Sequence, residues 1–333
     1  MEESLAVKNE NNGGWSPKTG FGRFLDRYFH ISERGSNIIR ELVGGLVIFL
    51  AMFYILPLNS NMLSSDWAGI IQQGVTTANI KWDGATEYIL LYGETWATVA
   101  EVRTGVFAAT AISAAVTTIV MGIYGKLPVG LASGLGLNSL IAYTVLLNMG
   151  FNFAQCMAIV LVDGILFLII SITPLRAWIV RSIPKSLKFA ISAGIGFFIA
   201  FIGFQKIGII VPNTATAVGF GDFTSPAVLT GMAGIVLVLV LSSLPQNKKW
   251  GFWVSKFAVI ISIVVMAIIC ASMGSAGVKG MPTFYDESYH ISNIGNISKV
   301  FGVAFFGFDA FLNPVAIALT FALLFVDFFD TTG

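Results

Sequence analysis

The chain has 333 residues, of which 56% are hydrophobic and only 11% carry a charged side chain. Soluble domains have about a quarter of their residues charged, so this chain has too little polar surface to enclose a water-soluble core of its size. Its mean hydropathy is +0.81, its net charge is +1, and no nucleic-acid partner is expected. Disorder, coiled coil and a small disulfide scaffold are excluded because long polar tracts, heptads and cysteine frameworks are missing. We therefore predict an all-α polytopic membrane protein in a lipid bilayer.

The N-terminal tail, residues 1–37, precedes the first apolar run. Residues 1–20 are polar and contain no hydrophobic stretch, so we expect no cleavable signal peptide. Apolar side chains then recur at helical spacing opposite Arg23, Asp26 and Arg27, which predicts an amphipathic helix lying in the membrane interface. A solvated connector is the alternative. The apolar residues of this pattern are Phe21, Phe24, Leu25, Tyr28 and Phe29.

Apolar runs of membrane-spanning length follow the tail, since a helix needs about 20 mainly apolar residues to cross the bilayer core. Such runs lie near residues 38–58, 104–125, 129–148, 154–174, 190–211, 226–244, 254–274 and 313–333. After the fourth run, residues 175–189 mix apolar and basic side chains, which predicts a second interfacial helix or, again, a solvated connector. Residues 275–312 form the connection before the last run.

The distribution of Lys and Arg predicts the orientation of the chain. Most of these residues lie in the tail and in the connections on the same side of the membrane, so the positive-inside rule places the N-terminus in the cytoplasm. Residues 175–189 are one such connection, with Arg176, Arg181, Lys185 and Lys188. Residues 64–102, which are rich in carboxylates, and residues 275–312 are then extracellular.

The third apolar run starts unlike the others. After Pro128 it contains Gly130, Gly134 and Gly136, which weaken a continuous helix. Irregular backbone at membrane depth is tolerated only beside protein or a water-filled cavity, and in transporters such broken spans line the substrate site. Asn138, next to the break, offers both a donor and an acceptor. The alternative is a small-residue contact between helices.

Aspartates lie within or beside the apolar runs, where an ionised carboxylate costs about 2.5–3.5 kcal/mol. Asp327 and Asp330 share one helical face and should titrate as a unit, one accepting a substrate N–H while the other carries a proton. Solvation of both at a cytoplasmic interface is the alternative. Asp163 would make a structural polar contact with Asn138 or the backbone, or bind ligand directly. Asp309 is expected at the outer interface.

The other chemistry-bearing residues indicate no enzyme. Cys156 and Cys270 lie in apolar runs and are expected to pack there without a redox role. The sequence contains no nucleophile–base set, phosphate loop or His and Cys cluster with metal-ligand spacing. No catalytic residue, metal or cofactor is therefore expected.

The run Val326–Gly333, which reads Val-Asp-Phe-Phe-Asp-Thr-Thr-Gly, resembles the VDxFDTTG signature of AzgA-like purine permeases in the nucleobase–cation symporter 2 superfamily. Further stretches resemble that family in the same order. They are Met52–Tyr54 in the first span, Gly134–Asn138 in the broken third span and Ile183–Gly196 between the fourth and fifth spans. The resemblance covers nearly the whole chain.

This resemblance implies a transporter fold of two inverted seven-helix repeats, of which the chain holds the N-terminal repeat and the start of the second. Spans 1–4, residues 38–174, and span 8, residues 313–333, would belong to the core domain that holds the substrate. Spans 5–7, residues 190–274, would belong to the gate domain.

The resemblance also implies import of hypoxanthine, adenine or guanine across the plasma membrane by proton symport. Asn138, Asp327 and Asp330 match positions implicated in purine binding, and the two aspartates would couple to the proton. Gly136 and Leu137 adjoin Asn138 at the break and would add backbone contacts. The preferred purine, the coupling stoichiometry, the oligomeric state and the separate roles of the two aspartates stay open.

The sequence departs from the family pattern in three respects. Ser133 replaces a proline, and Asp163 replaces a glutamate. The chain also ends inside span 8, before the family's tenth span with its glutamate and the rest of the gate, so we expect a fragment that is inactive alone. The alternatives are a transporter of the same fold for uracil, xanthine or a small anion, and a nonfunctional truncated membrane product.

Overall fold

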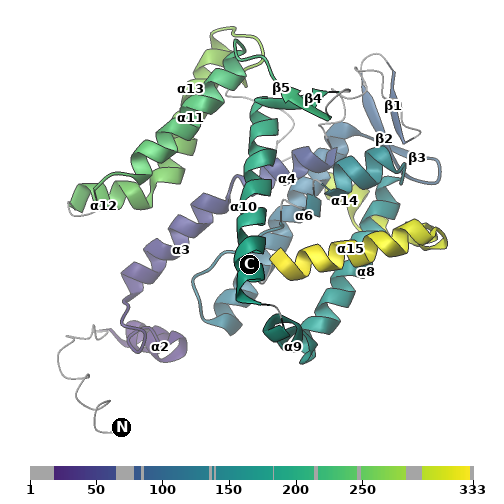
Figure 1. The fold of residues 1–333 in the computed structure, drawn as a ribbon. Helices are drawn as coiled ribbons and strands as arrows, with labels where there is room; N and C mark the ends of the chain where they lie inside the picture. The colour runs from purple at the N-terminus through teal and green to yellow at the C-terminus, as the bar shows by residue number, and fades with distance from the viewer. Residues whose placement is uncertain are drawn as a thin grey trace. The chain divides into compact units, whose positions relative to one another are not determined.

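A computed structural model describes residues 19–64, 79–83, 86–134, 137–138, 140–182, 184–213, 217–245, 249–282 and 295–330. Helices dominate this part of the chain (Figure 1), and 5 of them are long and apolar enough to cross a membrane. These are Ile38–Ser64, Val99–Gly125, Phe153–Ile172, Lys185–Ile207 and Ala258–Ser275, with shorter apolar helices at Pro226–Ser242 and Pro314–Phe329. The chain is therefore a polytopic helical membrane protein, as its composition predicts.

The chain divides into two compact units, the first formed by residues 1–54 and 112–132, the second by residues 55–111 and 133–333. The first unit contains α2 (Gly20–Phe29), α3 (Ile38–Met52), the second half of α6 (Val99–Val120) and the short π-helix η2 (Met121–Gly125).

Helix α2 has the amphipathic character that its sequence predicts. Thr19 caps its start by accepting a hydrogen bond from the Gly22 N–H, and Phe21 and Phe24 stay exposed on its apolar side. The Asp26 carboxylate of α2 accepts hydrogen bonds from the backbone N–H and the hydroxyl of Ser32, which follows the helix, each at 2.7 Å. These two bonds lower the pKa of Asp26 because they favour its charged form.

Irregular backbone follows η2 and occupies the start of the predicted third span. Lys126 ends the π-helix in the left-handed conformation, and residues 127–134 form neither helix nor strand. A Cβ at Gly130 would lie 3.1 Å from the Met52 sulfur, so this close approach favours glycine. The Leu131 N–H donates to the Thr118 hydroxyl at 3.0 Å, which satisfies one backbone group that an unbroken helix would have paired internally.

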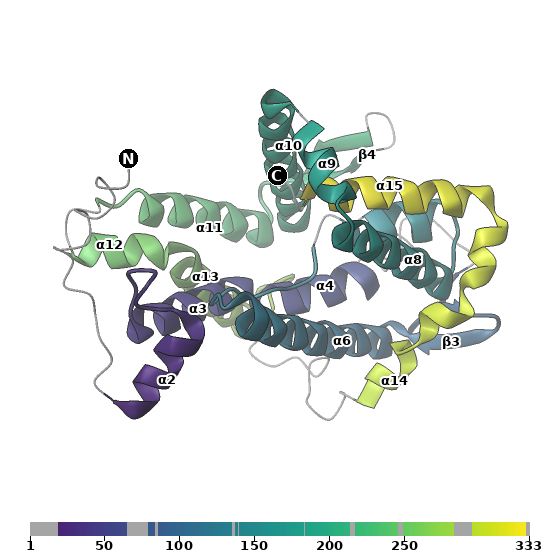
Figure 2. The same cartoon turned by 90° about the horizontal axis from the view of Figure 1, so that it is seen from below.

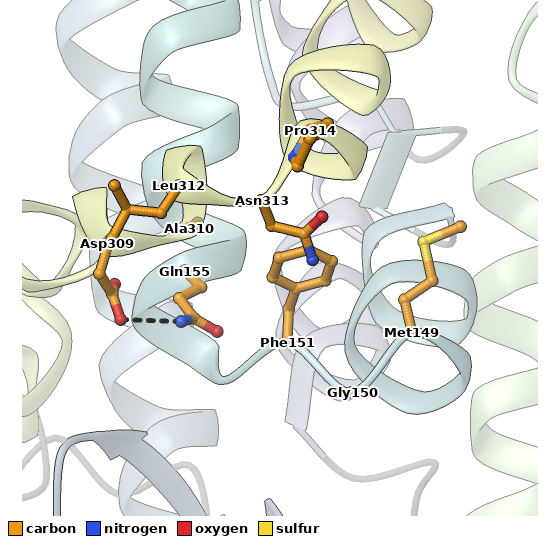
Figure 3. Close-up of a pocket in the computed structure, with 9 residues that line it drawn as sticks. All are labelled: Met149, Gly150, Phe151, Gln155, Asp309, Ala310, Leu312, Asn313 and Pro314. Carbon is orange, nitrogen blue, oxygen red and sulfur yellow. Dashed lines mark hydrogen bonds between the residues drawn. The ribbon is translucent and has the colours of Figure 1, made fainter.

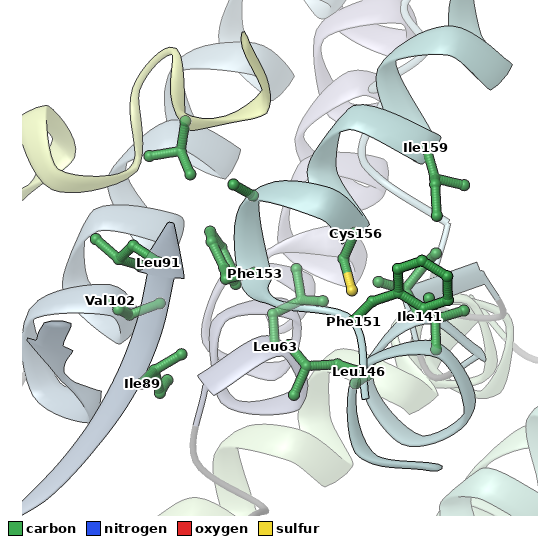
Figure 4. Close-up of a cluster of buried hydrophobic side chains, with 14 of the residues drawn as sticks. Leu63, Ile89, Leu91, Val102, Ile141, Leu146, Phe151, Phe153, Cys156 and Ile159 are labelled. Atoms are coloured by element: carbon green, nitrogen blue, oxygen red, sulfur yellow. The ribbon is translucent and has the colours of Figure 1, made fainter. Parts of the chain in front are cut away.

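The second unit is built around one apolar core (Figure 4). Its helical walls are α4 (Ile55–Ser64), the first half of α6, the π-helix η3 (Leu140–Asn148), α8 (Phe153–Ile172) and α15 (Pro314–Asp330). Buried side chains from these elements meet in a single cluster, which includes Val102, Leu146, Phe153, Cys156 and Leu323. Cys156 is thus a packing residue, as the sequence predicts.

A three-stranded antiparallel sheet closes one side of this core, and the sequence analysis did not predict it. Its strands are β1 (Ile80–Trp82), β2 (Glu87–Tyr92) and β3 (Thr95–Thr98), in the order β1-β2-β3. Alternation along β2 turns Ile89 and Leu91 into the core. The connection over residues 64–102 therefore contributes to the core as well as joining two spans.

The middle of the second unit carries helices with much less burial. These are α9 (Leu175–Ser182), α10 (Lys185–Ile207), α11 (Pro226–Ser242), α12 (Lys249–Lys256) and α13 (Ala258–Ser275). The hairpin β4 (Ile210–Asn213) and β5 (Ala217–Phe220) joins α10 to α11, which packs along α13 (Figure 1). Large apolar side chains such as Phe197 on α10 and Ile268 on α13 are exposed, as expected for surfaces that face lipid.

A series of short turns leads into α15. These turns are the short α-helix α14 (Ile297–Val300) and the 3-10 helices η6 (Val303–Phe306) and η7 (Phe308–Leu312). A Cβ at Gly307 would lie 2.1 Å from the Ala154 carbonyl oxygen, so only glycine lets this segment meet the start of α8. From there α15 runs beside α8, as Figure 2 shows.

Candidate functional site

One group of polar side chains links α4, α6 and the turn that follows the irregular segment. The Asn138 amide donates to the Asn59 side-chain oxygen. The Asn59 amide in turn donates to the Thr110 hydroxyl at 2.7 Å, and Thr110 donates to the Val106 carbonyl at 2.7 Å. Asn59 and Thr110 are both buried. This chain of bonds orients the Asn138 side chain immediately after the break.

A second polar group lies between α8 and α15. The Asp163 carboxyl on α8 lies close to the Asp327 carboxyl on α15, near enough for the two groups to interact. Asp163 is only 2% exposed, and its Oδ1 atom has no hydrogen-bond partner among the described residues. Thr320, one turn before Leu323 on α15, is also buried and donates to the Ala316 carbonyl. Ionisable groups in such surroundings are expensive and typically functional.

A pocket of about 520 Å³ lies where these two helices begin (Figure 3). The Gln155 amide donates to the Asp309 carboxylate at 3.0 Å across it, and Asn313 accepts from the Val315 N–H. Asn152 and Gln155 form a reciprocal capping box at the start of α8. Asp163 comes ten residues after Phe153, so the carboxyl pair lies about 15 Å further along α8 than this pocket.

The structure brings some of the predicted site residues together and leaves others undescribed. Asn138 bonds to Asn59 rather than to Asp163, whose partner is Asp327. Leu137 packs partly buried against the core. Asp330 is the last residue of α15, and its side chain lies outside the described part, as do Gly136 and residues 331–333.

Asn59 is the residue that the sequence analysis missed. It follows directly on the first apolar run, within the polar triplet Asn59-Ser60-Asn61 after Pro57. Asn59 could have been predicted from the amide and hydroxyl side chains that follow a proline in an otherwise apolar helix. Proline removes a backbone hydrogen bond, and such side chains help to replace it.

No group of three or more His, Cys, Asp or Glu that would hold a metal ion occurs in the described ranges. The arrangement is that of polar side chains set between apolar helices, with Asn138 shortly after irregular backbone. Such a region is characteristic of membrane transporters that bind small polar solutes.

Comparison with known proteins identifies the family. Residues 90–333 match the Permease family, Xan_ur_permease, and the chain belongs to it. It is thus related to transporters rather than to enzymes, and the resemblance drawn from Val326–Gly333 is confirmed at the level of nucleobase permeases.

Several curated relatives match along almost the whole chain. A protein named as a permease in Methanocaldococcus jannaschii is 31% identical over 315 residues, which are 93% of this chain and 59% of that protein. The guanine/hypoxanthine permease PbuO of Bacillus subtilis is 29% identical, covering 92% of this chain and 60% of PbuO. The adenine permease AdeP of Escherichia coli is 28% identical, covering 93% of this chain and 58% of AdeP. The chain therefore spans about three fifths of the length of these relatives.

Proposed function

We propose that this protein imports purine nucleobases across the plasma membrane together with protons. The observation that carries the proposal is the position of Asp327 on α15, close to the buried carboxyl of Asp163 and within the purine-permease signature. The names of the relatives PbuO and AdeP, which refer to guanine, hypoxanthine and adenine, support the choice of substrate class.

The chemistry of a purine suits the side chains proposed to bind it. A purine presents ring N–H groups, and in some bases an exocyclic NH₂, that a carboxylate such as Asp327 accepts. Asn138 carries both a donor and an acceptor and would read an adjacent acceptor–donor pair on the base. Backbone at Gly136 and Leu137 would add polar contacts, and Asp330 would hold or protonate the site.

The proposed transport cycle uses the division into domains implied by the resemblance. A core domain, residues 38–174 with 313–333, would hold the base and move against a gate domain of residues 190–274. The positive-inside pattern of Lys and Arg supports a cytoplasmic N-terminus. The proton would be the coupling ion, so uptake would rise as the outside is acidified.

Uptake of radiolabelled hypoxanthine, adenine and guanine tests this proposal in a strain that lacks its own purine permeases. Because the relatives are longer, two forms of the protein are compared, the 333-residue chain and the reading frame extended downstream. We expect proton-dependent uptake of at least one purine by the extended protein, and none by the chain alone. Unlabelled uracil and xanthine are added as competitors. If either one inhibits purine uptake more strongly than the purines do, that nucleobase is the preferred substrate.

Single variants separate the proposed roles of Asp327 and Asp330. Asp327→Asn is expected to abolish uptake by loss of binding, and Asp330→Asn to lose only the response to pH. The matched control is Asp309→Asn, which removes a carboxyl at the pocket in Figure 3. This variant should transport normally. If the extended protein reaches the membrane and takes up no purine at any pH, the proposal is wrong.

A further inference from the structure

A small pocket in the first unit has no part in the proposed binding of a nucleobase. It encloses about 220 Å³ between α2, the start of α3 and the segment that follows η2. Most of its lining is apolar, and Phe29 on α2, Leu42 on α3 and Leu127 after η2 contribute to it. Ligand pockets typically enclose about 300–1,000 Å³, so this one suits a length of hydrocarbon chain rather than a whole polar solute.

Two cations and one carboxylate complete the lining of the pocket, namely Arg34, Lys126 and Glu41. The Arg34 guanidinium donates a hydrogen bond to the Lys126 carbonyl, which joins the turn after α2 to the end of η2. This bond uses only part of the donor capacity of a guanidinium. The Lys126 ammonium lies 5.4 Å from the centre of the Tyr28 ring, a cation–π contact that leaves its N–H groups able to donate. Both side chains can therefore donate to an anion.

The elements around the pocket belong at the membrane surface. Helix α2 lies at the start of α3 (Figure 1), and its apolar side chains Phe21 and Phe24 are exposed. Such side chains insert between lipid headgroups. The Tyr28 hydroxyl donates to the Ile123 carbonyl at 3.3 Å, which holds α2 against η2. Because α3 begins the membrane-length helix Ile38–Ser64, the pocket lies at the depth where lipid phosphates give way to acyl chains.

The charge of this region favours an anionic ligand. Residues 19–54 and 112–132 carry five Lys and Arg against three Asp and Glu. One of these carboxylates, Asp26, already accepts two hydrogen bonds from Ser32. Another, Glu41, lines the pocket and would repel an anion, so it opposes binding without reversing the sign of the charge. A phosphate that carries a hydrocarbon chain matches both parts of the lining, whereas free phosphate or a purely apolar molecule matches only one.

We infer that this pocket binds an anionic phospholipid at the level of the headgroups. The phosphate accepts hydrogen bonds from Arg34 and Lys126, and the start of one acyl chain enters the apolar part of the pocket. The lipid then fastens α2 to the beginning of the first span. This inference concerns the first unit alone and does not rest on the proposed transport of purines.

Native mass spectrometry of the purified protein tests the inference. The 333-residue chain is kept in a neutral detergent and given equal amounts of phosphatidylglycerol and phosphatidylcholine with the same acyl chains. The unmodified chain should retain at least about tenfold more phosphatidylglycerol, because two basic side chains at a lipid surface each favour an anionic lipid about fivefold. Excess inorganic phosphate should not remove this lipid, because the buried acyl chain adds binding that free phosphate lacks.

Single variants test the charged side chains. Arg34→Gln and Lys126→Asn each remove one cation and should lower the preference about fivefold. Asparagine is chosen to replace Lys126 because it tolerates the left-handed conformation of that residue. Glu41→Gln removes the repelling carboxylate and should raise the preference. The matched control is Arg40→Gln, which removes an exposed cation of α3 outside the pocket lining and should change nothing.

A substitution of Gly122 tests the pocket separately from its charges. A Cβ at Gly122 meets nothing within 4 Å, so the side chain of Gly122→Leu has room to enter the pocket and should reduce retention of phosphatidylglycerol with every cation in place. All variants are first checked for a single size-exclusion peak.

Three results would overturn the inference. The first is equal retention of the two lipids by the unmodified chain. The second is a preference that stays unchanged in both Arg34→Gln and Lys126→Asn, or retention that stays unchanged in Gly122→Leu. The third is displacement of the lipid by inorganic phosphate, which would make this a site for free phosphate.

Discussion

The helix pairs α8–α15 and α11–α13 have similarly apolar sequences but bury different side chains. Helices α8 and α13 reach the same mean hydropathy of 2.4. Between α8 and α15 lie Asp163 and Asp327, whereas α11 meets its neighbours through small residues such as Gly234 and exposes Val236 to lipid. Hydropathy thus finds both helix pairs, whereas only the contact between α8 and α15 holds carboxyl groups from both helices among the described residues.

The largest expected effect comes from the apolar core beneath the site. Phe153→Ala opens a cavity in a fully packed cluster and should lower the free energy of unfolding by about 3 kcal/mol. Phe197→Ala on α10, where the ring is 77% exposed, is the matched control and should have little effect. Thermal melting of the purified chains in detergent measures both, and equal losses would contradict a core confined to α8, α15 and their neighbours.

Glycine substitutions test how closely the segment before α15 approaches α8. Gly307→Ala places a Cβ against the Ala154 backbone, which cannot move aside, and should destabilise by about 1–3 kcal/mol. Gly194→Ala on α10 meets nothing within 4 Å and should be neutral or slightly stabilising. The same melting assay applies. A tolerated Gly307→Ala would mean that this close contact does not form.

A pair of threonines on α6 tests the polar network around Asn59. Thr110→Val removes the acceptor of the Asn59 amide and should cost about 1–2 kcal/mol, because a buried donor loses its partner. Thr117→Val, seven residues further along the same helix, loses only a bond to the Ser113 carbonyl at an exposed position and should change stability by less than about 0.5 kcal/mol. Melting curves that do not differ would show that the network adds no stability.

The smallest effect concerns Asp26, a partly exposed carboxylate that contrasts with the buried Asp163. Its pKa is lowered in the folded state by the two bonds from Ser32, so their stabilising effect is present above the unfolded pKa and is lost as the pH falls through the folded pKa. Protection of the Ser32 amide against hydrogen exchange should therefore decrease on acidification below about pH 4. In Asp26→Asn that pH dependence should disappear, and its persistence would assign the protection to another group.

Most of the spans, the amphipathic α2 and the packing of Cys156 could be predicted because each depends on local composition and spacing. The sheet β1–β3 was missed since it lies in a connection read only for its charge, although Ile89 and Leu91 alternate as a half-buried strand does. From the sequence, Asp327 was paired with Asp330, and Asp163 with Asn138 or the backbone. Sequence spacing cannot bring Asp163 close to Asp327, or Asn138 to Asn59. Those contacts depend on which helices pack together, and that is decided by the whole core.

The central claim is that polar side chains of the second unit, Asn138 and Asp327 among them, bind a nucleobase. Equilibrium binding of radiolabelled hypoxanthine to the purified extended protein tests it most directly. We predict that Asn138→Ala and Asp327→Asn each weaken binding at least about tenfold, the loss expected for one hydrogen bond to a polar ligand. Ser262→Ala, which removes a buried hydroxyl from α13 outside the proposed site, should bind as the unmodified protein does. Unchanged binding in both site variants would contradict the account.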